Sequence, residues 1–479
     1  MKQEPTEVPW LREARAPRRG RNPRPSGRGG RQRSTLWTRE HRIPTIGLVL
    51  VVTLVAFEFM GVATALPTLV ADLHGGRLYA WPIAAFTAAS AIGTVAGGRI
   101  SDRRGPGGPL LGAVVLFAIG LLIGGTAHSM LVLLAGRVVQ GLGAGAVVVA
   151  VYVVIGAVYP ERDRPAASAL TAAAWVVPSL VGPLVAGLVT EHFGWRWVFL
   201  GLVPLIAVAV PLLVPVIRRL PPHEPAAGPR RRGLLLAGIG AAVGVSVFTA
   251  AVQRLTLLSV PIAVAGVVVL AFALRRLLPA GTVLAARGLP SVVLSRGLLA
   301  GSFAATEVYI PLALTSVHGF SPATAGLPLT ASALGWSGAA AWQGRHPDLS
   351  RSMLLRVAFL LVAVGLGGIA MIAWHWAPGW LALVSWTVGG TGMGLGVSSI
   401  SVLLLGLSPA GERGYNTSAV QLSDMIGTVL LVGVGGVLVD ALGSTTHPTV
   451  PLFIFDLLMC LTALFGASVP AGRTAGRLP

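Results

Sequence analysis

Three acidic residues lie deep inside long apolar runs of the sequence, at Glu58, Glu307 and Asp424. A fourth, Asp456, lies nearer the outer end of the last run, where a structural role is favoured. An ionised side chain at such a position is costly unless it faces a polar cavity or has a partner. A desolvated carboxyl group can take up a proton from one side of an apolar layer and release it to the other. The spacing therefore predicts proton-binding groups around one cavity, and the alternative for each acid is a structural hydrogen bond to a neighbouring helix.

Other kinds of chemistry have no residues to support them. The sequence contains no HExxH zinc motif, no Walker-type phosphate loop and no G-x-S-x-G nucleophile elbow. Its single cysteine, Cys460, lies in an apolar run, so no intramolecular disulfide and no cysteine metal cluster can form. We therefore expect no enzymatic activity, no cofactor and no metal site.

The composition indicates a membrane protein. Of the 479 residues 54% are hydrophobic and only 11% are charged, which lies outside the range of soluble domains. The formal net charge of +19 comes from an N-terminal arm and from short segments between apolar runs, which is typical of topology signals rather than of nucleic-acid binding. We expect the lipid bilayer as a partner and no nucleic acid.

The apolar runs are long enough for about fourteen membrane-spanning helices, so the fold class predicted is an all-α, polytopic bundle. Arginine is concentrated in the arm and in alternate connections, while the opposite connections hold only Arg77, Arg196 and Arg254. Because cytoplasmic loops carry the excess of basic residues, this asymmetry predicts an even number of spans with both termini in the cytoplasm.

The same pattern divides the chain. Residues 1–42 are rich in Arg, Pro and Gly and are expected to form a disordered, basic cytoplasmic arm. A half of about six helices is predicted at residues 43–217, a basic linker with two plainer helices at 218–280, a second half at 281–470, and a cytoplasmic tail at 471–479.

Several motifs resemble those of the major facilitator superfamily. The loop after the second apolar run, Gly98-Arg99-Ile100-Ser101-Asp102-Arg103-Arg104-Gly105, is similar to the signature loop of that family. In this loop glycines permit close helix packing, and Asp102 with the arginines can form a charge cluster. The usual basic pair after the last glycine is replaced by Pro106 and Gly107. The resemblance implies a gating loop made of Gly98, Asp102, Arg103 and Gly105, and the alternative is an ordinary basic loop.

Two further motifs fit the same family. The fourth run, with Arg137-Val138-Val139-Gln140-Gly141, resembles the second family motif, whose arginine is linked to proton coupling. Arg137 is deep in its run and should face inward, either in that role or as a structural hydrogen-bonding group. The fifth run resembles the antiporter motif of exporters, with Pro178, Gly182, Pro183 and Gly187 allowing close packing and a bend.

The segment from Glu58 to Ala65-Leu66-Pro67 resembles the first-helix motif of fourteen-span drug/proton antiporters. This resemblance implies a bacterial plasma-membrane exporter of lipophilic or cationic small molecules, driven by the proton motive force and associated with antibiotic resistance, with Glu58, Arg137, Glu307 and Asp424 at the proton and substrate cavity. The alternative is a dedicated exporter of one endogenous metabolite or natural product. A transport-inactive sensor or scaffold is less favoured, and a monomer is expected.

Overall fold

The computed structural model describes residues 37–38, 41–160, 163, 167, 170–171, 173–218, 220, 233–254, 259–346, 348–409, 413–442 and 448–469. The chain divides into a unit Met1–Thr35 and a unit Leu36–Pro479. The basic arm expected at residues 1–42, except for a few residues at its end, and the tail expected at 471–479 lie outside the described residues. Within the described ranges all regular elements are helices.

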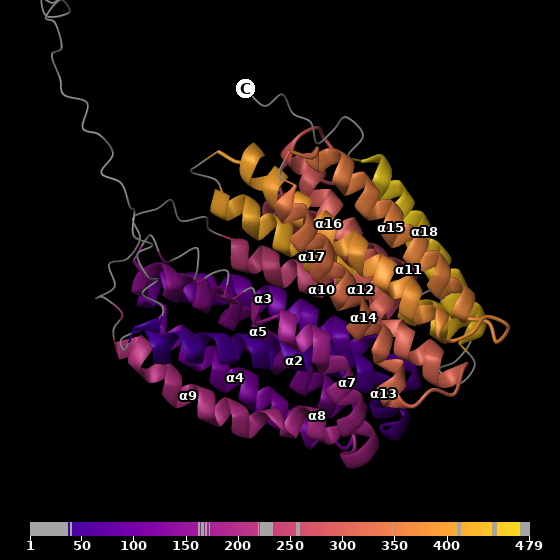
Figure 1. Ribbon diagram of the computed structural model, residues 1–479, viewed down its shortest axis with the longest axis horizontal. Coiled ribbons are helices and arrows are strands. Elements are labelled where there is room, and N and C mark those ends of the chain that lie inside the picture. The colour runs from indigo at the N-terminus through magenta and orange to yellow at the C-terminus, as the bar shows by residue number, and fades with distance from the viewer. Residues whose placement is uncertain are drawn as a thin grey trace, which may run out of the picture. The chain divides into compact units, whose positions relative to one another are not determined.

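The N-terminal helices are shown in indigo and magenta in Figure 1. They are α2 (Arg42–Asp72), α3 (Trp81–Arg104), α4 (Gly107–Gly125), α5 (Met130–Val158), α7 (Val176–Phe193), α8 (Arg196–Leu200) and α9 (Leu202–Arg218), with the 3₁₀ helix η2 (Gly76–Leu78) before α3. Among these helices α3 and α4 pack on α5, and α2 packs on α7 and α9.

The C-terminal helices, in orange and yellow, form a second packed group. They are α12 (Leu289–Ser316), α13 (Pro322–Ala325), α14 (Leu327–Arg345), α15 (Arg351–Ile372), α16 (Leu381–Leu407), α17 (Arg413–Leu442) and α18 (Thr449–Ser468). The two groups meet where α2 packs on α12, α3 on α17, and α7 on α13 and α14.

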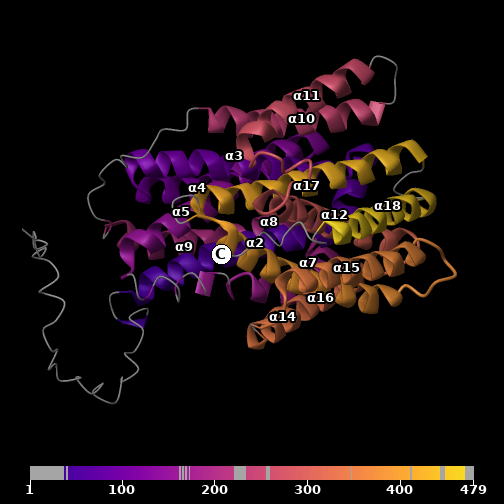
Figure 2. The same ribbon diagram turned by 90° about the horizontal axis from the view of Figure 1, so that it is seen from above.

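Helices α10 (Leu234–Arg254) and α11 (Ser259–Leu277) form a hairpin between the two groups in sequence. Figure 2 shows this hairpin along one edge of the bundle. Its inner helix, α10, packs against α3 of the N-terminal group and against α17 of the C-terminal group. The two plainer helices expected from the sequence are therefore peripheral, but they border both groups.

Helix boundaries follow from local chemistry. Ser129 and Ser350 each accept a hydrogen bond from a backbone N–H of the following first turn, at 3.4 Å, and so cap α5 and α15. Helix α3 ends where Gly105 adopts φ 78°, and α7 ends where Gly194 adopts φ 89°. Glycine reaches this positive-φ region without the steric cost of a Cβ atom.

Twelve helices of the described chain are long and apolar enough to cross a membrane. Many large apolar side chains on them are exposed, such as Val208 at 59%, Phe272 at 65% and Val384 at 65%. Apolar surface on this scale would not be stable in water, and it is the surface that hydrocarbon solvates. The chain is a multi-pass, all-α bundle, as the composition predicted.

The expected count of about fourteen spans stays a prediction. The two expected runs that are not among the twelve coincide with α10 and α14. Within α10 only the stretch Leu236–Phe248 is counted, as a shorter apolar helix.

Candidate functional site

Glu58 and Arg137 form an ion pair in the middle of the N-terminal helices. Glu58 lies halfway along α2, Arg137 lies in the second turn of α5, and neither side chain is exposed. Arg137 Nη1 donates to Glu58 Oε1 and also, at 3.2 Å, to Gln140 Oε1. Arg137 Nε donates to the carbonyl oxygen of Pro82 at 2.9 Å, and its guanidinium carbon lies 4.3 Å from the centre of the Phe86 ring. The sequence prediction that Arg137 faces inward is confirmed.

Close packing of α3 on α5 brings these groups together. Any Cβ atom added to Gly141 or Gly145 of α5 would overlap a backbone carbonyl oxygen of α3, that of Phe86 or that of Ser90. The two backbones therefore touch, which places the first turn of α3 within reach of Arg137. The glycines of the second family motif have a direct packing role here.

The hydrogen-bonding capacity of this ion pair is not filled. Three polar atoms are buried without a hydrogen-bond partner in the described part of the chain, namely Glu58 Oε2, Arg137 Nη2 and Gln140 Nε2. Buried polar groups are normally satisfied, because each unmade hydrogen bond costs about 1–3 kcal/mol. The cluster thus retains free acceptor and donor positions at which a proton or a water molecule can bind.

Glu307 lies in a different environment. It lines a partly open cavity between the N-terminal and C-terminal helices, whose volume of about 340 Å³ includes the part that opens to the surroundings. The lining residues are Phe59, Met60, Ala63, Ile83, Ala304, Glu307, Val308, Leu329 and Thr428. No ion pair to Glu307 is found within the described part of the chain. Its carboxyl group is the only titratable group of this lining.

Aromatic side chains support the Glu307 helix on its other side. Phe303, one turn before Glu307, stacks on Trp386 of α16 with ring centres 4.3 Å apart. Trp386 is buried, and its Nε1 has no hydrogen-bond partner among the described residues. The helix that carries Glu307 is therefore packed against α16 through aromatic rings.

Glu58 does not share this cavity, although the sequence predicted that both acids would face one. Phe59, Met60 and Ala63 point into the space, and successive residues of a helix are rotated by about 100°, so Glu58 faces α5 instead. Glu58 and the Glu307 cavity therefore lie on opposite sides of α2, and this helix contacts both.

Asp424 forms an ion pair with Arg296, a residue outside the predicted site. Arg296 of α12 donates to Asp424 Oδ2 of α17 through Nε at 2.9 Å and through Nη2 at 2.5 Å. The side chains are 13% and 24% exposed, respectively. The signal for Arg296 was available, because an arginine inside an apolar run requires a partner. Asp424 does not line the Glu307 cavity, although Thr428, one turn further along α17, does.

Asp456 of α18, for which the sequence favours a structural role, accepts a hydrogen bond from Thr306 of α12 at 3.3 Å and is buried. This is the hydrogen bond to a neighbouring helix that such a role requires. Among the residues described, no group of three His, Cys, Asp or Glu side chains is placed to hold a metal ion.

The antiporter motif lies between the two helix groups. A Cβ atom on Gly187 would lie 2.6 Å from the Cα of Ala323 in α13, and one on Gly326 would lie 2.8 Å from the carbonyl oxygen of Pro183. Pro178 and Gly182 of the same helix are buried, and Gly182 faces Met60 of α2. Helix α7 therefore contacts α2 on one side and the C-terminal helices on the other.

A second contact joins the groups at the same end. Tyr79, just before α3, donates its hydroxyl proton to the carbonyl oxygen of Val308 at 3.2 Å and stacks on Tyr309, with ring centres 5.4 Å apart. Both contacts lie at the end of the bundle where α2 and α12 finish and α3 and α14 begin.

The predicted gating loop forms the other end of α3. Gly98 lies within the helix, Arg103 is exposed in its last turn, and Gly105 ends it. The side chain of Asp102 lies outside the described residues. The charge cluster expected at this loop stays a prediction.

Curated proteins resemble the chain over different lengths. A probable multidrug-efflux transporter of Mycobacterium tuberculosis is 28% identical over 400 residues, which cover 80% of this chain and 84% of that protein. An acurin A biosynthesis cluster MFS-type transporter of Aspergillus aculeatus is 33% identical over 157 residues, 33% of this chain and 28% of that protein. The chain spans less than a third of the length of the first curated relatives that it matches.

Solved structures show the same fold at low sequence identity. A POT family transporter gives a TM-score of 0.68 at 16% identity and covers 90% of this chain and 97% of its own. A D-xylose-proton symporter gives 0.62 at 16% identity, with 89% and 97% covered. The sequence profile of the Major Facilitator Superfamily matches residues 48–382. This match establishes that the chain belongs to the Major Facilitator Superfamily, and its long apolar helices make it a multi-pass membrane protein.

Proposed function

We propose that this transporter is a proton-coupled antiporter that exports lipophilic or cationic small molecules. The observation that carries the proposal is the position of Glu307, an acid without a cationic partner in the described chain, in an otherwise nearly apolar cavity between the two helix groups. A largely apolar cavity with one convergent acid suits a lipophilic cation. The likeness to a probable multidrug-efflux transporter supports the same substrate class.

In this mechanism Glu307 carries either a proton or a cationic substrate. A proton that arrives from outside neutralises the carboxyl group, and the neutral group no longer attracts the cation, which leaves. Loss of the proton toward the cytoplasm restores the charge, so that substrate and proton compete for one site. Each exchange then moves the two species in opposite directions.

The Glu58–Arg137 pair is the proposed coupling element. Phe59 and Met60 line the Glu307 cavity while Glu58 binds Arg137 on the opposite side of α2. A proton bound by Glu58 would weaken the ion pair. Arg137 would then keep only its hydrogen bonds to Pro82 and Gln140. A rotation or shift of α2 that follows would reshape the cavity wall directly.

Alternating access would arise from rocking of two halves, residues 43–217 and 281–470, with residues 218–280 between them. The Gly187–Ala323 approach and the Tyr79–Tyr309 stack close one end of the bundle. We propose that this is the outer end of the bundle and that both termini are cytoplasmic. In this proposal the chain spans the plasma membrane about fourteen times. It acts as a monomer.

The experiment compares Glu307→Gln and Glu307→Asp with wild type in proteoliposomes that carry an imposed pH gradient. Efflux of ethidium, a lipophilic cation, and the accompanying proton movement are both followed by fluorescence. Glu307→Gln should abolish both fluxes, and Glu307→Asp should retain part of them. The matched control is Glu191→Gln at the exposed end of α7, which should transport normally. Gradient-driven ethidium efflux by Glu307→Gln at the wild-type rate would sink the proposal.

The second candidate is a dedicated exporter of one endogenous metabolite or natural product. It is favoured by the 33% identity to the acurin A biosynthesis cluster transporter over a third of the chain. Because the same residues would carry the proton, the two candidates differ only in substrate range. Efflux of several structurally unrelated lipophilic cations supports the first candidate, whereas efflux confined to one compound supports the second.

A further inference from the structure

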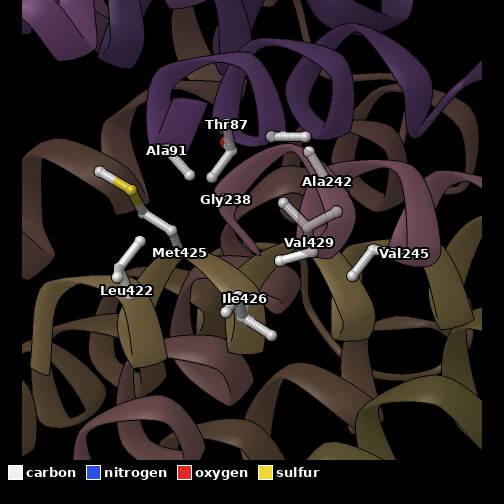
Figure 3. A pocket seen from close by; sticks show the side chains of 11 residues that line it. Thr87, Ala91, Gly238, Ala242, Val245, Leu422, Met425, Ile426 and Val429 are labelled. Carbon is white, nitrogen blue, oxygen red and sulfur yellow. The ribbon is translucent and has the colours of Figure 1, made fainter. Parts of the chain in front are cut away.

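A second cavity lies apart from Glu307, where the peripheral hairpin meets the bundle. It is a partly open space between three helices, and its volume of about 320 Å³ includes the part that opens to the surroundings. Side chains from these helices point toward one another across it (Figure 3). The lining residues are Thr87, Ala88 and Ala91 of α3, Gly238, Ala241, Ala242 and Val245 of α10, and Leu422, Met425, Ile426 and Val429 of α17. The small residues of α3 and α10 leave the space that larger side chains would fill.

One polar side chain interrupts this apolar lining. Thr87 is only 7% exposed, and its hydroxyl group has no hydrogen-bond partner among the residues that the structure describes. A hydroxyl group buried in this way normally has a partner, because the unmade bond is costly. An apolar molecule with one acceptor oxygen would fill the space and satisfy that hydroxyl group at the same time.

The surroundings of the cavity are hydrocarbon. On α10 the residues that face away from the bundle are apolar and exposed, with Leu236 at 73% and Val243 at 48%, and the neighbouring α11 exposes Phe272 at 65%. Lipid tails therefore cover the outer side of the hairpin. Water is scarce at this depth, so a molecule that enters the cavity comes from the lipid phase.

The second cavity also lies next to the Glu307 cavity. We call the contact between α3 and α17 the seam. Ile83 and Thr428 line the Glu307 cavity on one side of the seam. Thr87, one turn after Ile83, and Val429, the residue after Thr428, line the second cavity on the other side. Only one pair of helices separates the two spaces.

We propose that the space between α3, α10 and α17 is a peripheral binding site for a lipophilic small molecule with one hydrogen-bond acceptor, which reaches the Glu307 cavity through the seam. The inference rests on the proposed export function, because it describes how a substrate dissolved in the membrane enters the transporter. Thr87 recognises the acceptor, and the small residues of α10 set the width of the site. The hairpin α10–α11 thus forms one wall of an entry site.

The site can be tested directly with benzophenone, which is lipophilic, has a single acceptor oxygen and is photoreactive. Purified full-length protein in lipid nanodiscs is irradiated with benzophenone, and the labelled peptides are identified by mass spectrometry. Labelling should be concentrated on the α17 segment that contains Met425. Ala242→Leu should remove most of it by filling the space, and Thr87→Val, which keeps the shape of the side chain, should reduce it by about fivefold, the effect of one neutral hydrogen bond.

The matched control is Val243→Leu, on the exposed face of α10 beside Ala242, and it should label like wild type. Labelling of Met425 that Ala242→Leu and Thr87→Val both leave unchanged would overturn the site. So would labelling spread evenly over the outward face of α11. Gel filtration of each variant verifies that it remains folded.

The entry role is measured as efflux of a neutral lipophilic substrate from proteoliposomes. Ala242→Leu should raise the substrate concentration for half-maximal efflux several-fold and preserve the maximal rate. An unchanged half-maximal concentration overturns the entry role. If wild type exports nothing, the proposed function fails, and the labelling experiment still decides whether the site exists.

Discussion

Removing the charge of Glu58 should show how much the buried ion pair with Arg137 stabilises the N-terminal helices. Glu58→Gln preserves an oxygen acceptor for Arg137 Nη1, and the bonds from Arg137 to Pro82 and Gln140 remain. Breaking a buried pair by removing one partner costs about 3–5 kcal/mol. Because the retained acceptor compensates in part, we expect the free energy of unfolding of this variant to fall by about 3 kcal/mol, the low end of that range.

The two partners should differ in a predictable way. Arg137→Met removes the guanidinium donors and leaves the Glu58 carboxylate buried with no counter-charge, so we expect the free energy of unfolding to fall by about 5 kcal/mol. Replacing a buried ion pair as a whole by apolar or neutral groups often changes stability little. The double variant, Glu58→Gln with Arg137→Met, should therefore lose less stability than Arg137→Met alone. The coupling energy of the cycle is then at least about 3 kcal/mol.

Thermal unfolding of the purified variants, followed by tryptophan fluorescence in one detergent, gives the order of stabilities. Wild type should be followed by the double variant, then Glu58→Gln, then Arg137→Met. If the losses of the single variants add up in the double variant to within about 0.5 kcal/mol, the two residues are not coupled, and the structural reasoning is refuted.

Transport by Glu58→Gln provides a second and independent readout. Below its unfolding temperature the variant should still bind ethidium but should lose efflux driven by a pH gradient. Glu191→Gln again provides the control. Unimpaired efflux by Glu58→Gln would remove Glu58 from the coupling mechanism.

Two further predictions concern packing and the second ion pair. Gly145→Ala should destabilise the protein by about 1–3 kcal/mol, because its Cβ would overlap a carbonyl oxygen of α3. A Cβ added at Gly156 of the same helix meets open space, so Gly156→Ala should be neutral or stabilising by up to about 1 kcal/mol. Equal unfolding temperatures for the two variants would contradict the packing. Arg296→Gln should cost about 1–3 kcal/mol, less than a fully buried pair because both partners are partly exposed. Exchanging the charges, Arg296→Asp with Asp424→Arg, should recover about half of that stability; no recovery in thermal unfolding would indicate that the pairing contributes little.

Much of the fold could be predicted from the sequence, because a bilayer restricts the choice of structure. Apolar runs of sufficient length must become helices when no water is present to satisfy their backbone groups. The same restriction identified Glu58, Arg137, Glu307 and Asp424, since charged groups in such runs require a cavity or a partner. Helix type, approximate helix positions and the inward direction of Arg137 followed from the order of the residues alone.

The partners of these residues could not be predicted, and the reason is geometric. Whether Glu58 meets Arg137 or the Glu307 cavity depends on the rotation of α2 about its own axis, which is fixed by the packing of α2 against α7, α9 and α12. Likewise Arg296 pairs with Asp424 only because close packing brings α12 beside α17, where a Cβ on Gly297 would lie 2.6 Å from Ser423 Oγ. The sequence by itself determined which groups must avoid lipid, through the cost of burying charge; only the tertiary structure decided which group each of them meets, because that depends on contacts between helices far apart in the chain.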